Sequence, residues 1–297
     1  VQLAKDKNNL QWEGIKGQWK GAMAAAGTLF VPVKLAVEFE SSMADVRKVV
    51  DFKTQEEYQS MQRDILNLSR KIPMTGKELA AIVAAGGQSG VAKENLTGFA
   101  SDAAKMGVAF NMAAGQAGEA MATLSNVLQI PIPKISRLGD AINHLSDNAN
   151  SKASDIVNVL TRIGSDIKQL GMTETQGAAW GSTFLSMGKA PELAAQAIKG
   201  MVTSLSVLKA GKGEEYLKQL GLSTEEFAKA MNKDANGAML DLLSRVKRLD
   251  KDAQFPMLME MFGQQYADDA LMMANNAEEY NRQLHLLEER DPSGNLK

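Results

Sequence analysis

The stretch that decides the fold is MTGKELAAIVAAGGQSGVAKE, residues 74–94. Thr75 and Glu78 form the Thr-x-x-Glu pattern of a capping box, in which a hydroxyl caps free amides at a helix start and a carboxylate returns the bond. An alanine-rich apolar run follows, and Gly86-Gly87 and Gly90 stand where its helical periodicity ends, as expected of C-terminal caps. The stretch therefore predicts a helix, a glycine turn and a second helix.

A second stretch, MTETQGAAWGSTFLSMGKAPE at residues 172–192, repeats this pattern 98 residues later in the same register. Thr173 and Gln176 stand where the first copy has its capping pair, and Gly188 marks the turn. A shorter echo covers residues 222–228, where Ser223 and Glu226 form another capping pattern. Chance similarity between alanine-rich helices and growth of the chain from helical hairpins are the two explanations.

The rest of the chain gives the same kind of signal. A further capping pattern begins at Thr54, and helices are expected to stop at Gly211, Gly213 and the Pro131/Pro133 pair, with Pro191 in a first helical turn. Helical spacing returns after a break at Pro32, and no segment alternates apolar and polar residues as strands do. Aromatic residues make up only 5 %, while 17 residues are methionine. We expect an all-α array of roughly a dozen short helices arranged as helical hairpins.

We expect four regions: an N-terminal helical segment at 1–33, helical-hairpin units at 34–150 and 151–290, and a loose tail at 291–297. The chain starts at Val1 without an initiator methionine, which suggests a piece of a longer chain. The most apolar stretch, residues 22–37, contains Pro32 and Lys34 and is shorter than the roughly 20 residues of a membrane-spanning helix. It predicts a buried helix end followed by a turn, or a segment that enters a membrane at a later stage.

Composition excludes several kinds of chemistry. With 33 basic and 35 acidic side chains, the net charge is −2, so the chain carries no strong nucleic-acid or anionic-membrane footprint. Cysteine is absent, which excludes disulfides, thiolate zinc sites, iron–sulfur clusters and thiol nucleophiles. Only two histidines occur, so a multi-histidine metal site within one chain is excluded as well.

No catalytic, cofactor-binding or metal site is expected, and the chain is not expected to be an enzyme. The phosphate-loop, His-Glu-x-x-His and Gly-x-Ser-x-Gly patterns are absent. His144 lies near Asp140 and Asp147 on a helix, which predicts a partly exposed histidine beside carboxylates, and His285 is expected to be solvated. The Asp268-Asp269 and Glu278-Glu279 pairs are typical of solvated helix faces. A cluster at Met257, Met259, Met261, Met272 and Met273 fits either ordinary core filling or a flexible face for other chains.

Three places resemble the tail tape measure proteins of bacteriophages and phage-tail-like particles. Phe39-Glu40-x-x-Met43-x-x-Val46 is similar to the family's opening Phe-Glu-x-x-Met signature. The two helix–glycine–helix stretches are the second place, although Met187-Gly188-Lys189 departs from the family's Ala-Gly. The third is Leu258-x-x-Met261-Phe262-Gly263, similar to a Leu-Phe-Gly element that follows a Leu-Leu-x-Arg helix, here Leu242-Leu243-Ser-Arg245. Met261 stands where leucine is usual, and the resemblance covers about Val37 to Leu284.

The resemblance implies a structural role. A tape measure protein sets tail length while the tail tube assembles around it, fills the tube lumen in several copies, and is released ahead of the DNA at infection. The implied partners are the tail tube protein, tail assembly chaperones, the baseplate hub or tail initiator, and other copies of the chain, without specific nucleic-acid recognition. The implied location is the tail tube lumen of the virion, after assembly in the host cytoplasm, and a late contact with the host membrane stays open. The alternatives are a membrane-active pore-former or injected effector, and a cell-wall hydrolase region.

Overall fold

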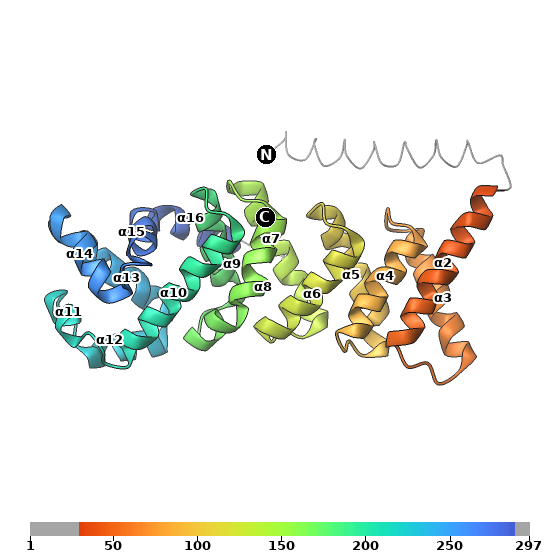
Figure 1. Ribbon diagram of the computed structural model, residues 1–297, viewed down its shortest axis with the longest axis horizontal. Coiled ribbons are helices and arrows are strands. Elements are labelled where there is room, and N and C mark those ends of the chain that lie inside the picture. Colours follow the sequence, from red (N-terminus) through yellow and green to blue (C-terminus); the bar gives the residue numbers. More distant parts are fainter. Residues whose placement is uncertain (1–29, 289–297) are drawn as a thin grey trace. The chain divides into compact units, whose positions relative to one another are not determined.

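The computed structural model describes residues 30–288, with side chains from Leu35 onward. Within this range the chain forms fifteen α-helices, two short 3₁₀ helices and no strand, which confirms the all-α prediction (Figure 1). The helices fall into two compact units. One holds the described chain up to Ser125 together with Ile130–Ser136, and the other holds Asn126–Gln129 together with residues from Arg137 onward. The expected division between hairpin units at residues 150 and 151 stays a prediction.

The first unit is built around one central helix. Its elements are α2 (Phe30–Val49), α3 (Gln55–Ser69), α4 (Gly76–Gln88), η1 (Lys93–Asn95), α5 (Leu96–Ala109), most of α6 (Ala114–Leu128) and η2 (Ile132–Lys134). Helix α4 packs against α2, α3 and α5. The side chains of Met43, Ile65, Leu79 and Ile82 are fully buried around it, so α4 holds the first hairpins together through apolar burial.

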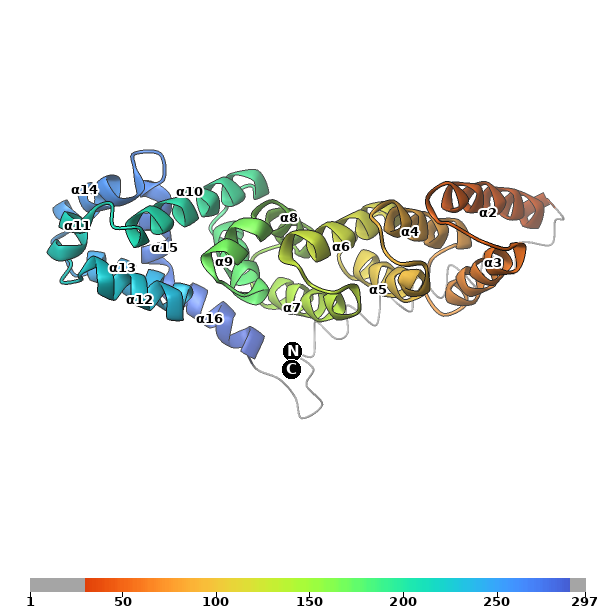
Figure 2. The same ribbon diagram turned by 90° about the horizontal axis from the view of Figure 1, so that it is seen from below.

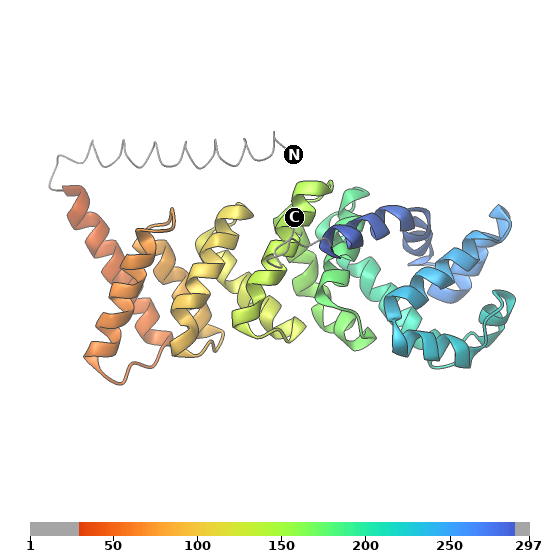
Figure 3. The ribbon, with the colours of Figure 1, turned by 180° about the vertical axis from the view of Figure 1, so that it is seen from behind.

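The second unit contains the remaining helices, which Figure 3 shows from behind. They are α7 (Ile135–Asn148), α8 (Ala153–Leu170), α9 (Glu174–Ser186), α10 (Pro191–Lys209), α11 (Glu214–Gln219), α12 (Thr224–Lys233), α13 (Ala235–Lys247), α14 (Lys251–Phe262), α15 (Ala267–Asn275) and α16 (Ala277–Glu288). Helices α8, α9 and α10 pack against one another, and the C-terminal α16 returns to pack on α9. Trp180 of α9 and Tyr280 of α16 are fully buried.

The predicted caps are present at the helix starts. The hydroxyls of Thr75 and Thr173 accept hydrogen bonds from the backbone N–H groups of Glu78 and Gln176 at 3.2 and 3.1 Å. The side-chain oxygens of Glu78 and Gln176 accept in return from the backbone N–H groups of Thr75 and Thr173 at 2.7 and 2.9 Å. Ser223 and Glu226 form a third complete capping box. At Thr54 the hydroxyl caps α3, but the carboxylate of Glu57 accepts from the N–H of Lys53 instead, so the reciprocal bond is shifted by one residue.

Seven helix ends share one backbone geometry, in which a residue with positive φ follows the helix. The next N–H donates to the carbonyl five residues back, as Val91 does to Gly86 and Lys189 to Phe184. This is the Schellman arrangement, which satisfies carbonyls left free at a helix end. The positive-φ residues are Gly90, Asn111, Gln129, Gly171, Gly188, Gly211 and Gly221.

Several predicted helix ends were wrong. Gly86 and Gly87 lie inside α4. They are required there because a side chain would collide with Phe99 at Gly86 and with Val50 at Gly87. Gly213 also has positive φ, but it precedes α11 rather than ending a helix. No turn follows Pro32, since α2 begins at Phe30 and proline fits a first helical turn.

The prediction of a buried helix end at residues 22–37 was also wrong for the part of this stretch that the structure describes. Residues 22–29 lie outside the described range, while Leu35 and Val37 are 53 % and 62 % exposed on α2. Among residues 30–288, no helix is long and apolar enough to cross a membrane. Leu35 and Val37 are therefore exposed on α2 rather than part of a buried helix end.

Candidate functional site: the hairpin turns and the contacts that close them

The two repeated stretches form turns with matching conformations. Helices α4 and α9 each have thirteen residues, and the residues that follow them, Ser89 and Met187, have φ, ψ of −84°, 4° and −83°, 5°. Gly90 and Gly188 then take φ of 81° and 89°. The first copy continues through the short helix η1 into α5, whereas the second enters α10 directly at Pro191. The two copies therefore share the turn conformation, which also occurs at five other helix ends of residues 30–288. Chance similarity and growth from helical hairpins both stay as explanations of the repeat.

Close contacts between helices depend on glycines. A Cβ atom on Gly164 of α8 would lie 2.4 Å from Val127 Cγ2, and one on Gly86 of α4 would lie 2.7 Å from Phe99. A Cβ on Gly200 of α10 would lie 2.4 Å from the ring of Tyr266. These separations leave no room for a methyl group. The helix axes can lie this close because glycine has no side chain.

A partly buried ion pair ties the second turn to a distant helix. Lys189, next to Gly188 in the α9–α10 turn, places its Nζ 2.6 Å from Oδ1 of Asp269 on α15, and the side chains are only 22 % and 12 % exposed. We call this pair the α9–α10 latch. The prediction that Asp268-Asp269 is a solvated helix face was wrong for Asp269, because sequence spacing gave no sign of a lysine 80 residues away.

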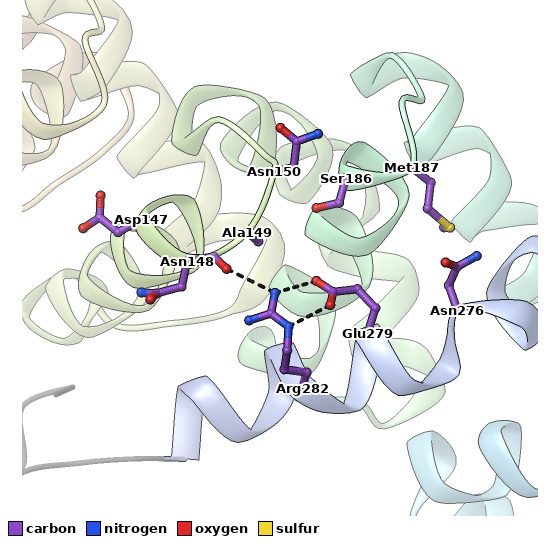
Figure 4. A pocket seen from close by; sticks show the side chains of 9 residues that line it. All are labelled: Asp147, Asn148, Ala149, Asn150, Ser186, Met187, Asn276, Glu279 and Arg282. Carbon is purple, nitrogen blue, oxygen red and sulfur yellow. Dashed lines mark hydrogen bonds and ion pairs between the residues drawn. The ribbon is translucent and has the colours of Figure 1, made fainter. Parts of the chain in front are cut away.

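The second acidic pair also has a structural contact, at a shallow groove of about 780 Å³ between α7, α9 and α16. Arg282 donates to both carboxylate oxygens of Glu279 at 2.7 and 2.6 Å and to the backbone oxygen of Asn148 at 3.1 Å (Figure 4). The hydrogen bonds from Arg282 lower the pKa of Glu279. Glu278 is exposed as predicted, but Glu279 is half-buried and helps to hold α16 on the end of α7.

The third place that resembles the tape measure family, with Arg245 and the Phe262-Gly263 pair, also has a structural role. Arg245 donates from Nε to Asp241 at 2.8 Å and from Nη1 to the backbone oxygens of Leu220 and Gly221 at 3.0 and 3.3 Å. It thereby caps the end of α11 and fixes the turn that follows. Phe262 is 3 % exposed, and Gly263 has φ 76° and ψ 160°, a conformation open to glycine but strained for other residues.

The histidines lie apart from these contacts. His144 is half-buried on α7, and burial raises the pKa of the neighbouring Asp147 while the histidine opposes that rise. His285 is 77 % exposed on α16, with Nδ1 3.5 Å from Glu288 Oε2. Within residues 30–288, no three acidic, histidine or cysteine side chains are grouped so that they could hold a metal ion.

The methionine cluster is divided between core and surface. Met257, Met261 and Met273 are buried, Met272 is half-buried and Met259 is 37 % exposed. Three of the five therefore fill the core of the second unit, and the cluster does not form one exposed face.

The turns, glycine contacts and latch define an all-α protein of short hairpins with closely packed helices. The chain belongs to the phage-related minor tail protein family, whose model matches residues 62–263. It is also similar to a probable tape measure protein of Halomonas phage phiHAP-1 (isolate -/Gulf of Mexico/-/2001), with 29 % identity over 263 residues. That match covers 84 % of this chain and 30 % of the relative, so the chain spans about a third of that relative's length. No solved structure matches the chain.

Proposed function

We propose that this chain is a segment of a tape measure protein. It sets tail length during assembly of the tail tube, fills the tube lumen, and leaves ahead of the DNA at infection. The family match and the similarity to a probable tape measure protein support this role. The observation that carries the mechanism is the short turn between α8 and α9, in which Gly171 has positive φ.

Such a turn can straighten by a local change. Between α8 and α9 only residues 171–173 are non-helical, and the bonds from Gly171 and Met172 to Lys168 and Ile167 hold the turn. A continuous helix requires Gly171 to move to helical φ, which glycine does at little steric cost. It also requires Thr173 to leave its extended conformation, with ψ of 160°, and to give up its capping bonds with Gln176. The turn and capping bonds are then exchanged for the ordinary bonds of a helix. Small residues on the helix surfaces would then lie between neighbouring copies of the chain, instead of between neighbouring hairpins of one chain.

Proline sets a limit on this straightening. Pro191 is the first residue of α10, and it has no N–H to bond to the end of α9. We therefore expect the α8–α9 turn to become continuous helix, while the α9–α10 junction keeps a bend. The upper limit on the length of residues 30–288, for a straight helix without bends, is roughly 390 Å at 1.5 Å per residue.

The proposed role is structural rather than enzymatic. The proposed partners are the tail tube protein, tail assembly chaperones, the baseplate hub or tail initiator, and other copies of the chain, without specific nucleic-acid recognition. The proposed location is the tube lumen, after assembly in the host cytoplasm, with a late contact with the host membrane. No observation within residues 30–288 favours the pore-former or the cell-wall hydrolase alternative.

The amount of the chain in tails before and after DNA ejection tests this function. Quantitative mass spectrometry should find the chain in full particles at a fixed ratio to the tube protein, and at a strongly reduced ratio in particles triggered to eject their DNA. The tube protein is the internal control, because it stays in the tail. An unchanged ratio after complete ejection would contradict release, and absence from full particles would contradict the lumen location.

A further inference from the structure

The first unit contains a groove with both apolar and polar lining between two helices that pack on the same third helix. Helices α2 and α3 both pack on α4 (Figure 2). An open groove of about 440 Å³ is lined by residues of α2 and α3. Ala36, Phe39 and Leu66 supply its apolar lining, and the polar lining includes Glu40, Gln62 and Arg63. Phe39 and Glu40 open the Phe-Glu-x-x-Met stretch, whose Met43 is core, so the start of that stretch lines the groove.

Phe39 and Leu66 both line this groove and both approach the first residue of α4. A Cβ added to Gly76, the first residue of α4, would lie 3.0 Å from Phe39 Cδ2 and 3.4 Å from Leu66 Cδ2. Both side chains therefore rest on the glycine, while Leu66 stays 42 % exposed. Leu35, one helical turn before Phe39 on the same side of α2, is 53 % exposed. An uncovered apolar strip of this kind favours the binding of a helix with an apolar face.

The preceding part of the same chain has the sequence of such a helix. Between residues 12 and 26, apolar residues recur at intervals of three and four. This spacing is typical of a helix that packs along one seam. The residues of the seam are Trp12, Ile15, Trp19, Ala22 and Ala26.

The connection to α2 places this seam within reach. Gly27-Thr28 is a turn signal directly after the seam. Trp19 lies nine residues before Thr28 and Phe39 lies eleven residues after it. At 1.5 Å per residue, two antiparallel helices joined there would place Trp19 and Phe39 within about 3 Å of the same height. A segment joined directly to its binding groove also acts at a high effective concentration.

The charges allow the same pairing. Residues 12–26 carry Lys16 and Lys20 against Glu13, and the charged lining of the groove is one acidic residue, Glu40, and one basic residue, Arg63. We propose that residues 12–26 dock as a helix in the α2–α3 groove of their own chain, with Trp19 against Phe39 and Leu66. The docked segment covers this apolar strip and prevents other copies of the chain from binding to it. The inference does not depend on the proposed tape measure function.

Site-directed cross-linking tests this docking, and the absence of cysteine makes the chain suited to it. Ala22→Cys is combined with Gln62→Cys in the groove and treated with a short bis-maleimide. The control combines Ala22→Cys with Ser60→Cys, an exposed position on α3 that does not line the groove. We expect cross-linking within one chain to be at least about tenfold faster for the groove pair, because docking raises the local concentration.

A second variant separates docking from random encounter. Leu66→Lys in the groove pair should reduce the rate to that of the Ser60 control, whereas Leu193→Lys, at a residue 54 % exposed on α10, should leave it unchanged. Equal rates for the groove pair and the Ser60 control would overturn the proposal. Predominantly dimeric products that increase with protein concentration would also overturn it, because the groove would then bind the segment of a second copy.

Discussion

Replacing Lys189 by methionine is expected to lower the free energy of unfolding of the chain by about 3 kcal/mol. The substitution keeps the apolar stem of the side chain but removes the charge that faces Asp269 at 2.6 Å. Asp269 is 8 % exposed, so its carboxylate would lose its cation without regaining full hydration. Urea unfolding followed by circular dichroism measures the change.

Two further variants show whether the loss comes from the latch. Lys199→Met removes a lysine that lies 3.9 Å from Asp166 at a more exposed site, where a pair contributes roughly 0–1 kcal/mol. Lys189→Met combined with Asp269→Leu removes both charges and should recover most of the lost stability. If Lys189→Met and Lys199→Met have equal effects, the α9–α10 latch does not stabilise the fold.

Gly164→Ala is expected to destabilise the second unit by about 1–3 kcal/mol, despite the higher helix propensity of alanine. The new methyl group would lie 2.4 Å from Val127 Cγ2 and 3.0 Å from its Cβ. A β-branched side chain has few rotamers with which to avoid such a contact, so the helices must separate. Thermal and urea unfolding measure the loss.

A helical glycine with free space around it provides the matched control. Gly98 lies in α5 with no atom within 4 Å of the added Cβ position, so Gly98→Ala should stabilise the protein by about 0.5–1 kcal/mol. Gly164→Ala combined with Val127→Ala should recover part of the stability lost in the single variant. A stabilising effect of Gly164→Ala alone would mean that the close approach is not required.

The local signals in the sequence predict the helix starts well. Thr75, Thr173 and Ser223 each precede a Glu or Gln by three residues, and the hydroxyl and carboxyl or amide groups bond as that spacing requires. These interactions lie within one helical turn, so neighbouring residues determine them. The glycines at the Gly90 and Gly188 turns were predictable for the same reason, because positive φ is a local property.

Features set by tertiary contacts were harder to predict. Asn111 and Gln129 take positive φ without being glycine. The Pro131/Pro133 pair marked the helix end at Gln129, but the helix end at Asn111 was not predicted. Gly86 and Gly87 resemble helix stops, but Phe99 and Val50 pack on them inside α4. The proline inside α14, Pro256, was also missed. The latch joins residues 80 positions apart, and helical periodicity carries no information about such pairs.

Tail length in a series of in-frame deletions tests the proposed ruler function most directly. Removal of residues 173–192, one helix–turn unit, should shorten the tail by about 30 Å, or by the nearest whole number of tube rings, since a helix rises 1.5 Å per residue. Removal of the equivalent residues 75–94 should have the same effect, and duplication of either stretch should lengthen the tail by as much. The control replaces residues 173–192 by an unrelated helical sequence of equal length, which should keep the tail length. Electron microscopy of the particles gives the lengths. A change in proportion to the number of residues is the predicted result, and an unchanged length across the series would contradict the extended-ruler account.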